Sequence, residues 1–531
     1  MEIQNIPFSQ TNFFSKLILD YISQNEHVKE FYNYEINIDA IEQIIADKQK
    51  ENIDRRILSE NIKKQYSDVV IQPQVTNNID LLESDNTFCI VTAHQLNIFG
   101  GPLYYIYKIA QTISACKQLK HNYPKYNFVP VYWMGSEDHD FEEINHIYLY
   151  NKKIEWTDKQ EGATGEYSTK SILPLIDELE AILGQTQNSV ELIEIYKEAY
   201  SKTNLTEATR YLVNILFGEY GLIVVDGNDA VFKQQYADVI KDELLNQNSY
   251  RFVTAKLNEL ETKGYKQQAF PRQINLFYLS KNSRERIEFD VNTSKYSVLN
   301  TNYSFTKEEI LNELQNHPER FSPNVILRPL FQQKILPSLA YIGGGGEISY
   351  WLQLKPVFDF YNVNFPQLLV RNSALLLNET MGKKIEKLGF EIQDFFKETE
   401  ELKKEFITRN TEDDIDVSIY KSEIESVFIK LQELTKSIDA SLVNTVGAEL
   451  QKSLQGIENI QKRLMKSLKQ RNETELNQIE KIKAQLFPNN SLQERTDNFS
   501  VYYAKYGKSF IDELIAEFDL YNNQFLIIQL S

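Results

Sequence analysis

Residues 88–146 restrict the possible folds of this chain more than any other stretch. Two short runs within it, 88–93 and 128–134, are rich in Val, Ile and aromatic residues and are bounded by polar, Gly or Pro segments, as buried strands are. The residues between them place apolar side chains close to helical spacing, at Ile106, Ile109, Ile113 and Leu119. The order strand, glycine loop, helix, strand predicts a βαβ crossover, and such a crossover requires a parallel sheet.

Polar side chains gather where both predicted strands end. The first strand ends in a cluster made of Thr92, His94, Gln95, Asn97, Gly100 and Gly101, and the second is followed by Glu137, Asp138, His139 and Asp140. In open parallel sheets, ligands bind in the crevice outside the carboxyl ends of the strands. We therefore expect the functional site at these two strand ends.

The overall composition excludes several classes of function. At 531 residues the chain is expected to form two to four structural units. A formal charge of −18 argues against wrapping nucleic acid, and no apolar run approaches the roughly 20 residues that span a bilayer. The N-terminus lacks the basic start and apolar core of a signal peptide, and two cysteines suggest no disulfide framework. We expect a cytoplasmic protein that binds neither nucleic acid nor membrane.

The regions around the βαβ unit suggest an α/β core with insertions. Residues 1–87 carry helical stripes and predict a helical segment that wraps the core, which is expected to span 88–376. A further buried strand is predicted at 222–226, and insertions at about 151–187 and 251–300. Short strands expected within the second insertion form either a small β-containing insertion or a pair of edge strands, at 270–272, 274–279 and 287–290.

A second candidate ligand-binding segment lies within 322–351. Residues 325–327 predict a short strand with Arg328 at its end. Arg328 could face a carboxylate or phosphate there, and Lys108, in the predicted crossover helix, could do the same. A helix is expected from Pro329 to Leu339, with Pro337 inside it or at its end. Four glycines, Gly343, Gly344, Gly345 and Gly346, then precede Glu347 and a run of helical periodicity. A glycine loop that opens a helix offers free N–H groups to an anion.

The C-terminal part changes character and predicts a coiled coil. From 377 to 487, Lys and Glu dominate and the apolar residues follow a three/four rhythm, which gives a narrow seam. A helix from about 443 to 486 needs a partner for this seam. Residues 419–438 supply one in an antiparallel hairpin, and a second copy of the chain supplies more, which predicts a homodimer. Residues 488–531 are expected to return to the globular body.

The acidic cluster at 137–140 leaves three interpretations open. It binds a metal together with His94 or His146, it forms a structural hydrogen-bond network, or it contacts a substrate amine and takes its proton. The glycine loops match neither the GxGxxG fingerprint nor the GxxxxGK[ST] phosphate loop, so neither motif is claimed.

Three blocks in order resemble one known family: TAHQLNIFGGPLYYIYKI, then VPVYWMGSEDHDFEEINH, then NVILRP with AYIGGGGEISYW. The chain resembles the cysteine-adding enzymes of bacillithiol biosynthesis, a cysteine ligase family, over essentially its whole length. The resemblance implies a Rossmann-like parallel-sheet core with insertions and a C-terminal antiparallel α-helical coiled coil that pairs two subunits. It also implies the last step of bacillithiol synthesis, in which cysteine is joined to the amine of glucosaminyl malate.

That reaction assigns roles to the residues of the three blocks. The cysteine carboxylate must be activated, most simply by ATP or another nucleotide, and no metal site is claimed. His139 or Glu137 is expected to be the general base, with Asp138 and His94 as further catalytic residues. Substrate or nucleotide binding is assigned to Thr92, Gln95, Asn97, Gly100, Gly101, Arg328, Gly343, Gly344, Gly345, Gly346 and Glu347.

Two competing hypotheses come from other classes of protein. In one, the coiled coil is the working part of an assembly protein, and the nucleotide fold is not catalytic. In the other, the cluster at 137–140 makes the chain a metal-dependent hydrolase. Nucleotide binding and metal analysis distinguish these hypotheses from the ligase.

Overall fold

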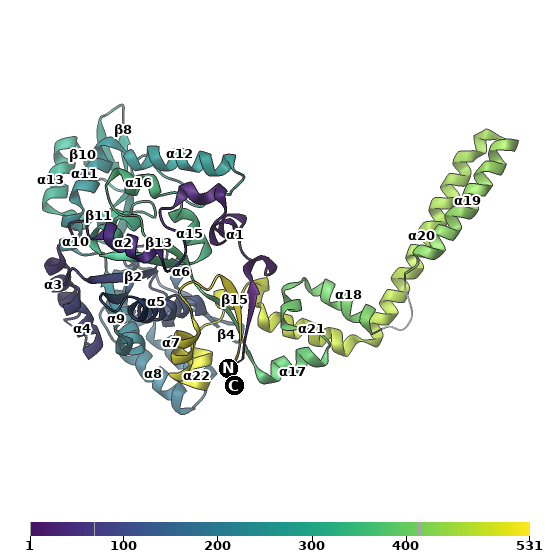
Figure 1. Ribbon diagram of the computed structural model, residues 1–531, viewed down its shortest axis with the longest axis horizontal. Coiled ribbons are helices and arrows are strands. Elements are labelled where there is room, and N and C mark those ends of the chain that lie inside the picture. The colour runs from purple at the N-terminus through teal and green to yellow at the C-terminus, as the bar shows by residue number, and fades with distance from the viewer. Residues whose placement is uncertain (1, 68, 411–415, 531) are drawn as a thin grey trace. The chain divides into compact units, whose positions relative to one another are not determined.

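The computed structural model describes residues 2–67, 69–410 and 416–530, and the chain divides into two compact units (Figure 1). We call the larger one, Gln4–Leu375 with Ser491–Ile527, the sheet unit. The other, Met1–Ile3 with Leu376–Asn490 and Ile528–Ser531, is the helical unit.

A five-stranded parallel sheet forms the centre of the sheet unit. Its order is β13 (Gln367–Val370), β12 (Ser338–Gly343), β2 (Thr87–His94), β3 (Asn127–Met134) and β6 (Ile223–Asp226). Counted along the chain this is the order 5-4-1-2-3, the doubly wound order of Rossmann folds. The predicted Rossmann-like parallel sheet is therefore confirmed.

The sequence of these strands explains their central place. All eight residues of β3 except the first are buried, as are all six of β12 and the first six of β2. Near-continuous apolar runs of this kind are typical of parallel sheets, which helices cover on both faces. The crossover helix α5 (Leu103–Asn122) packs against β2 and β3, which confirms the predicted βαβ unit.

Three predictions around the sheet are wrong. Residues 325–327 form a turn, and the strand there is β11 (Phe321–Pro323); Arg328 begins α14 (Arg328–Ile335). The expected helix to 339 ends earlier because Pro337 has no N–H to donate, and the apolar run that follows is β12 itself. Residues 270–272 are not a strand either; they belong to the loop before β7.

The predicted strands within 251–300 join a separate antiparallel sheet. Its order is β10 (Ser304–Phe305), β9 (Lys295–Val298), β8 (Ser283–Asp290), β7 (Leu276–Ser280) and β11. The turn between β7 and β8 contains only two residues, and Asn282 adopts φ +59° there, a conformation that Asn tolerates well. Of the two arrangements left open, the small β-containing insertion is the one observed.

Two smaller sheets are also present. Strand β4 (His146–Leu149) pairs with β5 (Lys152–Glu155), and β1 (Glu2–Pro7), β15 (Gln524–Leu530) and β14 (Ser373–Asn378) form a three-stranded sheet. The remaining helices are α1 (Lys16–Ile22), α2 (Ala40–Lys48), α3 (Arg55–Gln65), α4 (Pro73–Leu81), α6 (Phe141–Ile144), α7 (Leu173–Leu183), α8 (Gln187–Ala199), α9 (Leu205–Phe217), α10 (Ala230–Gln235), α11 (Ala237–Asn246), α12 (Asn248–Thr262), α13 (Lys307–Asn316), α15 (Gly345–Trp351), α16 (Lys355–Phe360), α22 (Ser500–Tyr506) and α23 (Ser509–Glu517).

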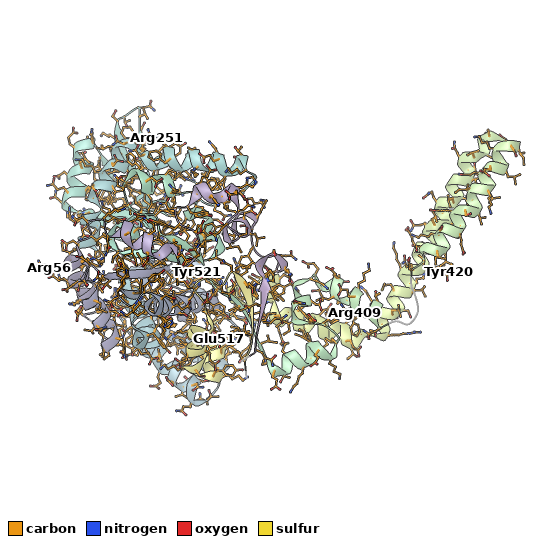
Figure 2. All side chains as sticks on the ribbon, viewed as in Figure 1. Arg56, Arg251, Arg409, Tyr420, Glu517 and Tyr521 are labelled. Atoms are coloured by element: carbon orange, nitrogen blue, oxygen red, sulfur yellow. The ribbon has the colours of Figure 1, made fainter. Side chains whose placement is uncertain are left out.

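The helical unit contains the predicted coiled coil. Helix α19 (Ser418–Ile438) turns back into α20 (Val443–Arg471), and Lys421 pairs with Glu458 across this hairpin at 2.9 Å. The expected single helix to 486 is two helices, because α20 ends at Arg471 and α21 (Glu473–Leu486) begins after Asn472. Helices α17 (Glu379–Lys387) and α18 (Thr399–Arg409) precede the hairpin. Figure 2 labels Tyr420, which belongs to α19 of the hairpin.

None of the helices in the described part of the chain is both long enough and apolar enough to cross a membrane.

The contact between β2 and β12 generates a prediction for Thr92. Its hydroxyl is buried and donates to the Ile342 carbonyl oxygen at 2.8 Å. We expect Thr92→Val to lower the free energy of unfolding by about 1 kcal/mol in urea denaturation, because a net hydrogen bond is lost while the side-chain shape is kept. Thr92→Ser, which keeps the hydroxyl, serves as the control. Unchanged stability in Thr92→Val would contradict the structural role of this bond.

Candidate functional site

A cavity of about 740 Å³ opens at the carboxyl ends of β2 and β12. His94 and Gln95 line it where β2 ends, and Gly344, Gly345 and Gly346 line it where β12 ends. From β2 the chain order runs to β3 and β6 on one side and to β12 and β13 on the other. Doubly wound sheets bind their ligands at the point where the strand order reverses in this way.

The cavity is much more basic than the chain as a whole. Six arginines line it against three carboxylates, although the formal charge of the chain is −18. Charges farther away than a Debye length of about 8–10 Å are largely screened, so the local arginines dominate the potential that a ligand meets. The arginines are Arg272, Arg284, Arg286, Arg328, Arg371 and Arg495, and the carboxylates are Asp138, Glu143 and Glu347.

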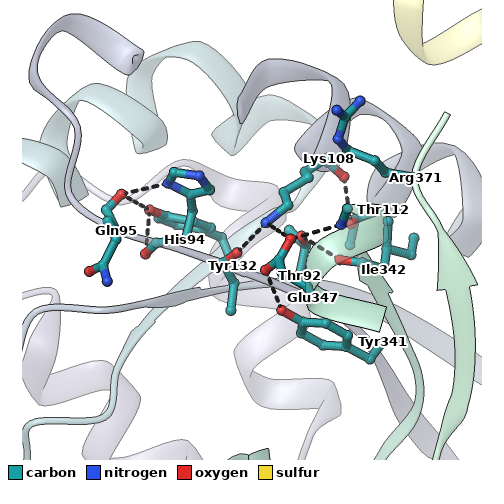
Figure 3. A network of polar contacts seen from close by, with 12 residues as sticks. Thr92, His94, Gln95, Lys108, Thr112, Tyr132, Tyr341, Ile342, Glu347 and Arg371 are labelled. Atoms are coloured by element: carbon teal, nitrogen blue, oxygen red, sulfur yellow. Dashed lines mark hydrogen bonds and ion pairs between the residues drawn. The ribbon is translucent and has the colours of Figure 1, made fainter. Parts of the chain in front are cut away.

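An ion pair between the buried Lys108 and the half-buried Glu347 joins the helix after β2 to the helix after β12 (Figure 3). Lys108 Nζ lies 2.5 Å from Glu347 Oε2 and donates to the Ala93 carbonyl oxygen at 2.8 Å. Glu347 also accepts from the Tyr341 hydroxyl at 2.9 Å and from the Gly344 N–H at 2.8 Å, which caps α15. Burial lowers the pKa of Lys108. Burial alone would raise the pKa of Glu347, but Lys108 outweighs it and the net shift is downward.

His94 ends β2 and lies against the Tyr104 and Tyr105 rings, at 5.3 and 5.4 Å between ring centroids. Its Nδ1 lies 3.1 Å from the Gln95 carbonyl oxygen, which only accepts, so Nδ1 carries the hydrogen and Nε2 the lone pair. Burial lowers the pKa of His94 to about 4, and the Lys108 ammonium adds to the effect. His94 is therefore neutral near pH 7, with Nε2 as a proton acceptor.

Asp138 holds together residues from three segments. Its Oδ2 accepts from Gln95 Nε2 at 2.7 Å and from both terminal nitrogens of Arg328 at 3.2 Å. Its Oδ1 accepts from the His139 N–H at 2.8 Å and lies 3.6 Å from Arg284 Nη1. Burial alone would raise the pKa of Asp138, but Arg328 and Arg284 hold that pKa well below its usual value. Asp138 is thus a permanent anion that positions two arginines.

The other two expected acid–base residues, His139 and Glu137, interact with Arg284 and Lys233. Arg284 Nη1 donates to His139 Nδ1 at 2.8 Å, so the ring lone pair is occupied and the hydrogen sits on Nε2. Burial, together with Arg284, lowers the pKa of His139. Glu137 is 5% exposed, forms an ion pair with the buried Lys233, and does not line the cavity.

The glycine loop faces the cavity with bare backbone. At Gly343 a Cβ would meet the Tyr341 ring at 2.8 Å, so packing excludes a larger residue there. At Gly344 and Gly345 the nearest atoms would be 3.4 Å away, and at Gly346 nothing lies within 4 Å. None of these four adopts a positive φ. Glycine in a helix costs about 1 kcal/mol relative to Ala, and at Gly346 neither packing nor conformation repays that cost.

Several residues assigned to binding lie outside the cavity lining. Thr92 bonds across the sheet, and Asn97 Nδ2 donates to the Glu143 carbonyl oxygen at 2.9 Å. Gly100 and Gly101 adopt φ +74° and +58° in the turn before α5, where glycine is favoured. A Cβ at Gly100 would also meet the Phe499 ring at 2.7 Å.

Sequence reasoning missed several residues that line the cavity. Glu143 follows the acidic cluster in the same block, and Arg371 directly follows β13, so both positions carried a usable signal. Partial desolvation raises the pKa of Glu143, and the neighbouring carboxylates of Asp138 and Asp140 add to it. Arg371 donates to Glu494 at 2.6 Å and lies over the Tyr104 ring. Arg284, in contrast, lies on β8 in the insertion, and the sequence around it does not indicate that it belongs to the site.

The geometry does not favour the metal interpretation of the acidic cluster. Glu137 pairs with Lys233, whereas Asp138 pairs with Arg328 and Arg284. Among the residues that the structure describes, no group of three or more His, Cys, Asp and Glu side chains is arranged to hold a metal ion.

Comparison with known proteins covers almost the whole chain. Residues 1–372 match "Bacillithiol biosynthesis BshC, N-terminal Rossmann-like domain", and 374–530 match "Bacillithiol biosynthesis BshC, C-terminal coiled-coil domain". A "Putative cysteine ligase BshC" of Flavobacterium psychrophilum is 45% identical over 513 residues, 96% of each chain. A protein of the same name from Flavobacterium johnsoniae is 43% identical over 526 residues, 98% of this chain and 99% of the other.

Among solved structures, a chain described as a putative arginyl t-RNA synthetase from Campylobacter jejuni is 11% identical. The match covers 88% of this chain and 98% of that chain with a TM-score of 0.23, which is too low to support any argument. The two domain matches and the full-length relatives agree with each other and with the observed sheet and coiled coil. The chain belongs to the BshC family of bacillithiol biosynthesis.

Proposed function

We propose that the protein is a ligase that joins cysteine to the amine of glucosaminyl malate, after a nucleotide has activated the cysteine carboxylate. The family and the names of its members support a cysteine ligase. The observation that carries the finer proposal is one cavity, at the switch point of a Rossmann sheet, that combines bare glycine backbone, six arginines and a neutral histidine.

The reaction sets three requirements. Amide formation from a free carboxylate is uphill in water, so an activated carboxyl group and its phosphate must be held. The glucosamine amine attacks only as the free base, so its proton must be accepted. Water must also be kept from the activated carboxyl group.

The glycine loop and Arg371 suit the anionic part of a nucleotide. Gly344, Gly345 and Gly346 leave room for close approach, and Arg371 lies next to Gly344, with Nε 3.7 Å from the position of a Cβ there. Arg371 is fixed by its buried ion pair with Glu494, so it is already oriented when a ligand arrives. The helix that begins at Gly345 adds its N-terminal dipole.

His94 is a better candidate for the general base than His139. The Nε2 lone pair of His94 is set by the hydrogen bond from Nδ1, whereas the Nδ1 lone pair of His139 is occupied by Arg284. In the site without ligand, burial and then the Lys108 ammonium lower the pKa of His94 to about 4. A bound polyanion beside it opposes the Lys108 field and raises that pKa, which makes the ring a stronger base in the loaded site.

Glu143 suits recognition of the amine before it loses its proton. Its carboxylate lines the cavity close to the negative charges of Asp138, Asp140 and Glu347, which attract a cation. Burial first, and then these charges, raise the pKa of Glu143. A substrate ammonium is a cation of this kind. Glu137, which is paired with Lys233, has no such access.

We also propose that the coiled coil pairs two copies of the chain. In the hairpin of α19 and α20, no residue is fully buried. Apolar side chains remain exposed along both helices, with Val427 at 55%, Leu431 at 43%, Leu434 at 56%, Ile438 at 78%, Ile460 at 57% and Leu464 at 45%. An apolar seam of this length is stabilised when a second hairpin covers it.

The first test is reconstitution with ATP, cysteine and glucosaminyl malate, followed by mass spectrometry of the product. We expect His94→Ala to lower kcat by about 10²–10⁴-fold, the usual contribution of general acid–base catalysis. His139→Ala, in the same cavity, is the matched control and is expected to keep most activity. Equal loss in both variants, or full activity in His94→Ala, would contradict the assignment of the base.

A second test separates stability from binding at Gly346. We expect Gly346→Ala to raise the free energy of unfolding by about 0.4–1 kcal/mol, because Ala restricts the unfolded chain and fits without a clash. The same change should raise the KM for the nucleotide by about tenfold or more, equivalent to about 1.4 kcal/mol of lost binding, because the methyl group occupies ligand space. Gly456→Ala in α20, also without neighbours within 4 Å, should stabilise without changing KM. An unchanged KM in Gly346→Ala argues against a ligand at this loop.

A third test addresses assembly. We expect the protein to sediment as a dimer in analytical ultracentrifugation, and Leu434→Glu to shift it toward the monomer because a charge enters the apolar seam. Lys436→Glu on the same helix changes charge outside the seam and should leave the dimer intact. A monomeric protein before substitution would rule out the proposed pairing.

A further inference from the structure

An exposed aromatic side chain, Phe270, stands in the wall of the cavity. Phe270 is 64% exposed, although it lines the cavity. It lies in the loop between α12 and β7, and Val325, 39% exposed, presents a second apolar side chain to the same cavity. Other aromatic side chains also line the cavity, but they are buried or half-buried, whereas Phe270 and Val325 are exposed; they are Tyr104, Trp133, Phe277, Tyr341 and Tyr350.

The backbone on both sides of Phe270 is anchored. On one side lies the fully buried side chain of Gln353. In the amide orientation in which both its oxygen and its nitrogen form hydrogen bonds, Gln353 accepts from the Gln268 N–H at 3.2 Å and donates to the Ala269 carbonyl oxygen at 3.0 Å. On the other, buried Asn275 accepts from the Arg272 N–H at 2.9 Å and donates to the Arg272 carbonyl oxygen at 2.8 Å.

The same asparagine ties this loop to the turn that carries Val325. Asn324 N–H donates to the Asn275 carbonyl oxygen at 3.1 Å, and Asn324 Nδ2 donates to Asn275 Oδ1 at 2.9 Å. Pro271 further restricts the backbone of Phe270 to extended conformations. The backbone is thus held in place while one large apolar side chain is presented to the cavity, the arrangement expected of a preorganised binding residue.

We infer that Phe270 stacks on the base of the nucleotide, with Val325 as a second apolar contact. This rests on the proposed function, in which the ligands are cysteine, glucosaminyl malate and a nucleotide. Cysteine is small, and glucosaminyl malate is a sugar with two carboxylates. The nucleobase is the ligand group with a large flat face, and base–aromatic stacking tolerates any base because every base has a π-face.

Direct binding measurements by calorimetry test this assignment, with ATP and inorganic tripolyphosphate as two probes. We expect Phe270→Ala to weaken ATP binding roughly ten- to hundredfold, as loss of one base–aromatic stack does, and to leave tripolyphosphate binding unchanged. Phe270→Trp should keep ATP binding. Tyr150→Ala removes another exposed aromatic, 67% exposed and outside the cavity lining, and should change neither ligand. Thermal unfolding of each variant shows that the fold is kept.

The remaining outcomes separate this inference from the proposed function. If the unaltered protein binds ATP and Phe270→Ala binds it equally well, the stacking role is wrong and the nucleotide proposal survives. If Phe270→Ala weakens tripolyphosphate as much as ATP, the loop supports the phosphate contacts and the stacking role is again wrong. A raised KM for glucosaminyl malate alone assigns Phe270 to the sugar instead. If the unaltered protein binds neither probe, the nucleotide proposal fails and this inference fails with it.

Discussion

The parallel pairing of β2 with β12 joins residues that lie 250 positions apart in the chain, as the bond from Thr92 to Ile342 illustrates. Everything in the cavity depends on this pairing. It brings the end of one strand, with His94 and Gln95, beside the end of another, with the glycine loop. It also places the buried Lys108 2.5 Å from Glu347, so an ion pair joins the helices that follow the two strands. In the five-stranded sheet, the strand order reverses between β2 and β12, the place where doubly wound sheets bind their ligands.

Electrostatics then gives similar residues different roles. His94 and His139 lie in one cavity, yet the hydrogen bond to the Gln95 carbonyl oxygen leaves a lone pair on His94 Nε2, and the bond from Arg284 occupies the lone pair on His139 Nδ1. Glu137 and Asp138 are neighbours in sequence, yet Glu137 pairs with the buried Lys233 and Asp138 pairs with Arg328. Of the two, Asp138 is the one that lines the cavity.

Local sequence patterns predict only some parts of the site. The strand ends at residues 92–97 and 137–140 and the glycine loop at 343–346 were found because strand periodicity locates where strands end. The cavity lining includes His94, Gln95, Asp138, His139, Arg328 and the glycines from Gly344 onward. Local sequence offered no sign that Lys108 would be buried or that Arg284 would arrive from a separate sheet, because both depend on contacts between distant segments.

The sequence by itself determined the βαβ unit, the strand at β6, the helical hairpin and the family, since each depends on local periodicity or on contiguous motifs. It did not predict β12, because the expected helix ran to 339 and the strand of this block was expected at 325–327; a short apolar run can form a helix or a strand until its neighbours are known. Tertiary structure alone decided the strand order, the pairing of Lys108 with Glu347 and the protonation of the two histidines. These features arise from distance and burial between segments far apart in the chain, and a pattern along the chain contains neither quantity.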